Sequence, residues 1–148
     1  MRIAVFHCPQ GASAEGIVQA FLDAGFPPSY LKKNRFDERT KKLVRRINQS
    51  LKTVILRAEG PKDLKARSFA SLRMTESVAL AIQYFGIQKC FLRNLAIGKK
   101  GNPRTLKLLK GFILNRLPIN QEIVTPPGAA ILSVLCERSR DYVGKFQV

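Results

Sequence analysis

The residues with the strongest metal-binding chemistry are His7 and Cys8, which adjoin each other at the end of a short apolar run. A neutral imidazole and a thiolate are good ligands for nickel, zinc or copper(I), and Glu15 could complete the set. Adjacent strand residues point to opposite faces, so both reach one metal only if the chain has left the strand by Pro9. Two interpretations stay open: a metal site, or packing for Cys8, a loop position for His7 and a helix-dipole role for Glu15.

Two loops rich in small residues precede predicted helices. The loop GASAEG (11–16) lacks the ending of a Walker loop and the spacing of a dinucleotide fingerprint. Ser13 and the helix N-terminus behind it therefore predict a generic anion site. In VTPPGAA (124–130), Thr125 is a predicted N-cap, and Gly128 allows close approach of another backbone or of a flat ligand. Packing and substrate binding both remain open for this segment.

The charge balance points to anionic partners. The chain has 26 Lys and Arg against 10 Asp and Glu, a net charge of +16, which favours nucleic acid, nucleotides or acidic lipid. Lys41-Lys42 and Arg45-Arg46 lie about one helical turn apart and predict a cationic stripe on one helix. The stripe lacks the interleaved aromatic residues that stack on bases. One candidate function is therefore a non-enzymatic basic module that binds nucleic acid or nucleotides.

Other features narrow the class of protein. The three cysteines, Cys8, Cys90 and Cys136, are far apart in the sequence and predict free thiols, as in cytoplasmic proteins. No stretch approaches the roughly 20 apolar residues of a membrane span, and the first apolar run is too short for a signal peptide. A single histidine beside a single nearby thiol offers no Ser-His-Asp or Cys-His-Asn set. We expect a cytoplasmic protein without membrane contact or triad-type hydrolase chemistry.

Hydrophobic periodicity predicts strands that alternate with helices packed on a sheet, in a single small α/β domain over residues 1–148. The predicted strands are 2–6, 51–56 and 87–97. The predicted helices are one between Ser13 and Gly25, then 37–48, 71–84 and 105–110, and a last one that follows the corner at 123–128 and runs through Leu135.

Four segments, in this order, resemble LarC-type nickel-insertion proteins. MRIAVFHCPQGASAEGIVQAFLDAGFP (1–27) resembles their opening strand, D-C-F-x-G-[IA]-S-G-D-M-like loop and helix ending in D-x-G. YFGIQKCFLRNLAIG (84–98) is similar to their L-G-[IV]-D-x-V-x-x-S-x-L-x-x-G segment. TLKLLKG (105–111) and EIVTPPGAAIL (122–132) look like T-L-E-L-L-K-G and E-[LI]-V-T-P-T-G-A-A-[IL]-L. The last of these motifs is the most specific.

The resemblance implies a role in maturing the nickel-pincer nucleotide cofactor of lactate racemase. Members of the family insert nickel into pyridinium-3,5-bisthiocarboxylic acid mononucleotide, as nickel chelatases of the lyase class that couple CTP hydrolysis to cyclometallation. Nickel and this phosphate-bearing nucleotide are thus the expected partners. Catalytic residues stay unassigned. The candidate metal ligands are His7, Cys8 and Glu15, and the candidate substrate-binding residues are Ser13, Thr125 and Gly128.

The chain departs from the family pattern in its middle. The first-loop Asp of the family is His7 here, and the family's histidine-rich tract and H-E-x-G-A-x-D-S segment have no counterpart. We interpret residues 35–76, roughly, as a divergent basic insert, and AEGPKDLKARSFASLRMT (58–75) resembles translated bacterial genomic repeats. The resemblance does not extend to the carboxy-terminal half of the family, so CTP with a divalent metal would act only if a companion chain supplies that half. Whether activity is retained is left open.

Overall fold

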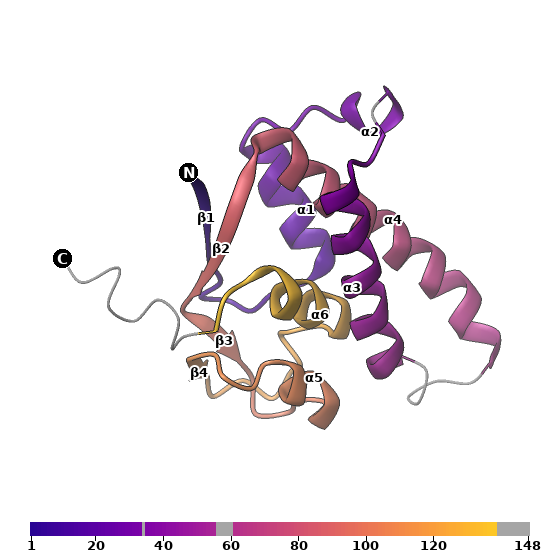
Figure 1. Cartoon of the computed structure of the whole chain (residues 1–148). Coiled ribbons are helices and arrows are strands. Elements are labelled where there is room, and N and C mark those ends of the chain that lie inside the picture. The colour runs from indigo at the N-terminus through magenta and orange to yellow at the C-terminus, as the bar shows by residue number, and fades with distance from the viewer. Residues whose placement is uncertain (34, 56–60, 139–148) are drawn as a thin grey trace.

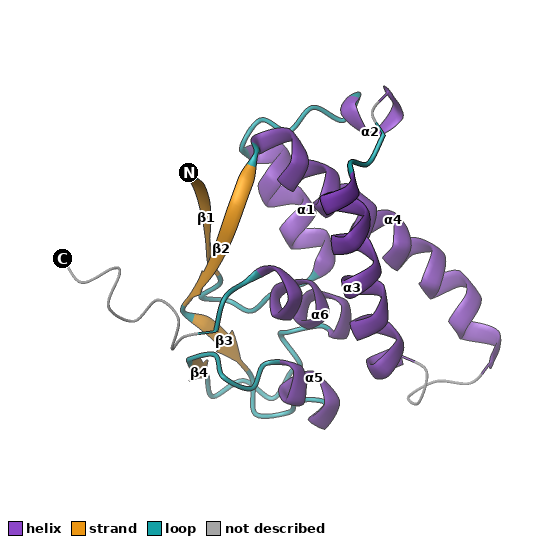
Figure 2. Ribbon diagram, in the orientation of Figure 1, coloured by secondary structure: helices purple, strands orange, loops and turns teal. Residues whose placement is uncertain are grey.

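The computed structural model describes residues 1–33, 35–55 and 61–138, and the side chains of these except 33, 53–55 and 61–72. It is a small α/β fold in which the helices lie on one side of short parallel strands (Figures 1 and 2). None of the helices in these ranges is long and apolar enough to cross a membrane. The elements are β1 (Arg2–His7), α1 (Ala14–Asp23), α2 (Tyr30–Lys33), α3 (Glu38–Ile55), α4 (Pro61–Phe85), β2 (Ile87–Arg93), β3 (Leu95–Ile97), α5 (Pro103–Leu108), β4 (Leu114–Arg116) and α6 (Pro126–Leu135).

The strands form two parallel pairs. β1 pairs with β2, with Val5 opposite Phe91, and β3 pairs with β4. The predicted strand 87–97 is therefore broken into two, because Asn94 between them has a φ of 52°, a left-handed conformation that interrupts a strand. On the other edge of β2, Cys136 forms a parallel bridge with Cys90, and the Glu137 N–H donates to the Cys90 carbonyl at 2.9 Å.

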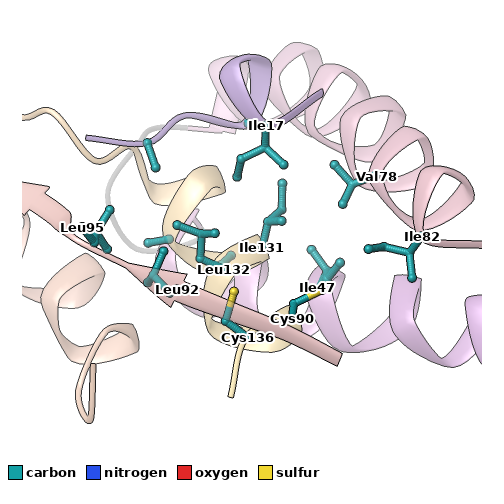
Figure 3. Packing of buried hydrophobic residues seen from close by; sticks show 14 of the residues in the cluster. Ile17, Ile47, Val78, Ile82, Cys90, Leu92, Leu95, Ile131, Leu132 and Cys136 are labelled. Carbon is teal, nitrogen blue, oxygen red and sulfur yellow. The ribbon is translucent and has the colours of Figure 1, made fainter. Parts of the chain in front are cut away.

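Helix α6 lies at the centre of the core and contacts α1, α3, α5 and β2. Its residues Ile131 and Leu132 are fully buried. Figure 3 shows them near Leu92 of β2 and Ile47 of α3, with Val78 of α4 further along the same apolar cluster. Burying side chains of this size contributes about 1.5–3 kcal/mol each to folding, so the short apolar helix helps to hold α1, α3, α5 and β2 together.

The predicted beginnings and ends of the first and last helices are confirmed. The Ser13 hydroxyl accepts from the Gly16 N–H at 3.0 Å, and Gly25, just after the C-cap Ala24, has a φ of 105°, as a glycine stop requires. Thr125 caps α6 by accepting from the Gly128 N–H at 3.2 Å. Each of these features depends on one or two residues of the local sequence.

The predicted strand 51–56 is wrong, because residues 51–55 are the last turns of α3, and Leu56 lies outside the described residues. Ile47 and Leu51 are both buried and four positions apart, so they continue the apolar stripe of the preceding helix. Packing of that stripe against α4 and α6 outweighs the β propensity of the sequence TVI. The elements α2 and β4 were not predicted.

The predicted helix 71–84 is confirmed as part of the longer helix α4. Of the repeat-like segment 58–75, residues 58–60 lie outside the described residues, and from Pro61 onward its main chain is helical.

Candidate functional site

Residues 11–13 and 123–128, more than a hundred positions apart in the sequence, form one corner at the carboxyl end of β1. The Ala12 N–H donates to the Ile123 carbonyl at 2.9 Å, and the Thr125 N–H donates to the Ala12 carbonyl at 2.9 Å. The two segments thus exchange main-chain hydrogen bonds like a short parallel ladder. The corner thus brings together the two segments rich in small residues, at 11–16 and 124–130, that precede predicted helices in the sequence.

Two glycines make this contact possible. Gly11 has a φ of 97°, and a Cβ there would collide with the carbonyl oxygen of Ile123. Gly128 is buried, and a Cβ on it would lie 2.8 Å from the Ala12 carbonyl oxygen. The small residue at 128 therefore serves the close packing of α6 on the first loop, which is the packing alternative left open by the sequence.

The two helix N-termini at the corner differ in the donors that they offer. In α6, Pro126 and Pro127 have no N–H, and the Gly128 N–H is taken by the Thr125 hydroxyl. In α1, the Ser13 cap takes the Gly16 N–H, while the described residues provide no acceptor for the N–H groups of Ala14 and Glu15. Of these two helix N-termini, only that of α1 has main-chain donors for which the described residues provide no acceptor, and these could bind an anion.

A cleft of about 360 Å³ opens beside the first loop, at the carboxyl end of β1. His7, Cys8 and Ser13 are among its lining residues, whereas Glu15, Thr125 and Gly128 are not. Of the three residues predicted to bind substrate, the structure therefore places only Ser13 at the cleft.

The predicted metal ligands are not assembled into one group. Among the described residues no three His, Cys, Asp or Glu side chains lie close enough together to hold a metal ion, and this includes the set His7, Cys8 and Glu15. His7 is exposed, whereas Cys8 packs against the core, as alternation along a strand requires. Burial raises the pKa of the Cys8 thiol above its ordinary value, so at neutral pH it is a thiol rather than a thiolate ligand.

The predicted cationic stripe is exposed on α3, and its residues fall on two sides of the helix. Lys41, Lys42, Arg45 and Arg46 are all exposed. The Lys41 ammonium lies 3.2 Å from the Glu38 carboxylate. Lys42 and Arg46 instead line clefts between α3 and the C-terminal end of α6, and neither Lys41 nor Arg45 does.

Two adjacent clefts, of about 390 and 480 Å³, lie along this side of α3 and share Arg46 and Val134. We call them together the cationic groove, after the five basic residues that line them. Of the described residues that line either cleft, Asp37 alone is acidic. The basic residues of the groove are Arg39, Lys42, Arg46, Lys107 and Arg138.

The sequence identified two of these five residues, Lys42 and Arg46, as part of a stripe. Arg39 is separated from them by one turn, and Lys107 and Arg138 belong to distant segments. The mutual contacts of α3, α5 and α6 bring these segments together, and no local sequence pattern reports such contacts.

Comparisons with protein-family models, with curated proteins and with solved structures found no significant match for this chain.

Proposed function

We propose that the chain is a nickel-insertion-type protein that acts in the cytoplasm on the nickel-pincer nucleotide cofactor, with nickel and a phosphate-bearing pyridinium mononucleotide as substrates. The corner is the observation that supports this proposal. The segments that resemble the family, at 1–27 and 122–132, hydrogen-bond directly to each other through Ala12, Ile123 and Thr125. A pair of motifs that form one structural unit has a reason to be retained together.

In this proposal the cleft beside the first loop takes the nucleotide. Ser13, which lines this cleft, is suited to a phosphate, because it is the N-cap of helix α1 and a helix N-terminus favours negative charge. His7 and Cys8, which line the same cleft, are the side chains that would meet nickel. Two ligands predict weak nickel binding, and a companion chain would have to add further ligands and the use of CTP.

To test the proposal, nickel(II) alone is titrated into the purified chain and into its His7→Ala and Cys8→Ser variants. The heat of binding is measured by calorimetry. We expect each substitution to weaken binding by roughly tenfold or more, since even the loss of a group that only orients a metal ligand typically lowers metal affinity by about 10–100-fold. Because burial raises the pKa of the Cys8 thiol, nickel binding must displace a proton, and the affinity should rise with pH.

The control is Glu76→Gln, a substitution at an exposed position on α4. Nickel binding that survives His7→Ala and Cys8→Ser together would contradict the proposal.

A second candidate function is supported by one specific observation: α3 carries exposed cations that pair with no carboxylate in the described part of the chain. No described acidic side chain forms an ion pair with Lys42, Arg45 or Arg46. Unpaired surface cations of this density are suited to a polyanion, which favours a module that binds nucleic acid.

A further inference from the structure

We propose that the cationic groove binds nucleic acid through its phosphate backbone, with Lys42, Arg46 and Lys107 as the phosphate contacts. This inference rests on the second candidate function and deepens it. The binding surface becomes a groove between α3, α5 and the end of α6, in place of the whole stripe 41–46 on one helix.

The spacing of the cations along α3 suits a chain of phosphates. Arg39, Lys42 and Arg46 are three and four positions apart and line the same side of the helix. With a rise of 1.5 Å per residue they lie about 4.5 and 6 Å apart along the axis. The lining of the groove continues on α3 to Ser50, so it follows the helix for roughly 16 Å. A duplex strand has one phosphate per 3.4 Å of helix axis, so this length spans about five base-pair steps of a duplex that lies along the groove.

The opposite wall of the groove is also basic. Lys107 of α5 and Arg138, which follows α6, line the second cleft across from Arg46. The Arg138 guanidinium is held 4.3 Å from the centroid of the Phe112 ring, an arrangement that stabilises a cation. A backbone in the groove would therefore meet positive charge on both sides. A flat bilayer surface cannot follow a concave groove, which favours nucleic acid over acidic lipid.

The lining also predicts how the nucleic acid is recognised. None of the described residues that line either cleft is aromatic, so base stacking has no platform here. Phosphate contacts position a nucleic acid without reading its sequence. We therefore expect binding that depends strongly on salt and little on sequence.

The test compares two double substitutions on the same helix. Lys42→Gln with Arg46→Gln removes two charges from the groove, and Lys41→Gln with Arg45→Gln removes two charges from exposed positions that line neither cleft. Binding is followed by fluorescence anisotropy with a labelled 20-nucleotide oligo(dT) and a labelled 20-base-pair duplex across a salt series. Phosphatidylserine vesicles are the lipid arm, and circular dichroism of each variant verifies folding.

We expect the groove variant to lose roughly tenfold in affinity and its slope of log affinity against log salt to fall by about 1.4 for oligo(dT), at about 0.7 for each lost phosphate contact. The control should lose less than about threefold. The duplex and single-strand arms show which nucleic acid fits the groove better.

Equal losses in the two variants would overturn the groove while leaving the second candidate function in place, because net charge alone would then account for binding. No binding of either oligonucleotide at 50 mM salt, or binding of vesicles alone, would overturn both. The nickel titration is independent of these outcomes, since the groove and the cleft beside the first loop share no lining residue.

Discussion

The corner and the cationic groove are built from different parts of the polypeptide. The corner is a contact between main chains, in which Gly11, Ala12 and Gly128 approach Ile123 and Ser13 with almost no side chain between them. The basic side chains of the groove form no ion pair with a described carboxylate, and Asp37 is the one acidic residue among the described residues that line it. Substitutions at the corner should therefore act on folding, and those in the groove on binding, so the two regions can be separated by experiment.

The largest effect is expected at Gly11. Gly11→Ala introduces a Cβ that collides with the Ile123 carbonyl oxygen at a φ of 97°, and we expect a loss of about 3 kcal/mol or more in the free energy of unfolding. Gly25→Ala is the matched control, because Gly25 has a similar φ of 105° but nothing within 4 Å of the added Cβ. It should lose only about 1–2 kcal/mol. Urea denaturation measures both, and equal losses would show that strain alone, without the corner contact, sets the cost.

A smaller effect is expected at the cap of α6. Thr125→Ala removes the hydroxyl that accepts from the Gly128 N–H, which should cost about 1 kcal/mol. Thr125→Ser keeps the hydroxyl and should retain most of this stability. Thermal unfolding distinguishes the two variants. If serine is no better than alanine, the methyl group of Thr125 matters rather than its hydroxyl, and the cap contributes nothing.

Asp37 should affect both folding and binding, because it caps α3 and lines the groove. Its carboxylate accepts from the Thr40 N–H at 2.7 Å. Hydrogen bonds from the Thr40 side chain and then from this N–H lower the pKa of Asp37 below its ordinary value of 3.8. The carboxylate therefore stabilises the fold above that pH, and the contribution is lost as the pH falls through the lowered pKa.

Asp37→Ala should cost about 1 kcal/mol at pH 7, and Asp37→Asn should cost little at pH 7 but lack the decline in acid. Urea denaturation at pH 7 and pH 3 checks this. Both variants should also bind oligo(dT) somewhat more tightly, since they remove the acidic residue from the groove. An unchanged acid dependence in Asp37→Asn would assign the decline to other groups.

The smallest effect is expected at Glu38. The Glu38 carboxylate and the Lys41 ammonium are 3.2 Å apart, with side chains 82% and 48% exposed, and an exposed pair of this kind contributes under about 0.5 kcal/mol. Glu38→Gln should therefore leave the unfolding midpoint almost unchanged. It should leave affinity for oligo(dT) unchanged within about twofold if the groove alone binds. A marked gain in affinity would indicate that the freed Lys41 also contacts phosphate.

The sequence predicted the parts of the fold that depend on local chemistry. Ser13, Gly25 and Thr125 mark helix ends through single hydrogen bonds or a single φ value, so they could be recognised without knowledge of the rest. The strand predicted at 51–56 was wrong because packing of Leu51 in the core decided its conformation. β4 is only three residues long and pairs with β3, so its strand character depends on a distant partner.

The candidate sites likewise combine features that the local sequence predicted with features that depend on packing between distant segments. His7 and Cys8 adjoin each other in the sequence, but His7 is exposed at the end of β1, whereas Cys8, the next residue, packs against the core. Lys42 and Arg46 were predicted, with Lys41 and Arg45, to lie on a cationic stripe of one helix, and the structure has all four exposed on α3. Their association with Lys107 and Arg138 depends on how α5 and α6 pack, and it required the three-dimensional structure.

The arrangement of β1 also has a consequence for the behaviour of concentrated protein. In the described part of the chain β1 has a strand on one edge only, and its outer face shows Ile3 and Val5, 44% and 49% exposed. An open strand edge beside exposed apolar side chains invites pairing between molecules. The charge of +16 opposes such encounters by mutual repulsion. Ionic strength therefore controls colloidal behaviour, and high salt, which screens the repulsion, should promote self-association that begins at this edge.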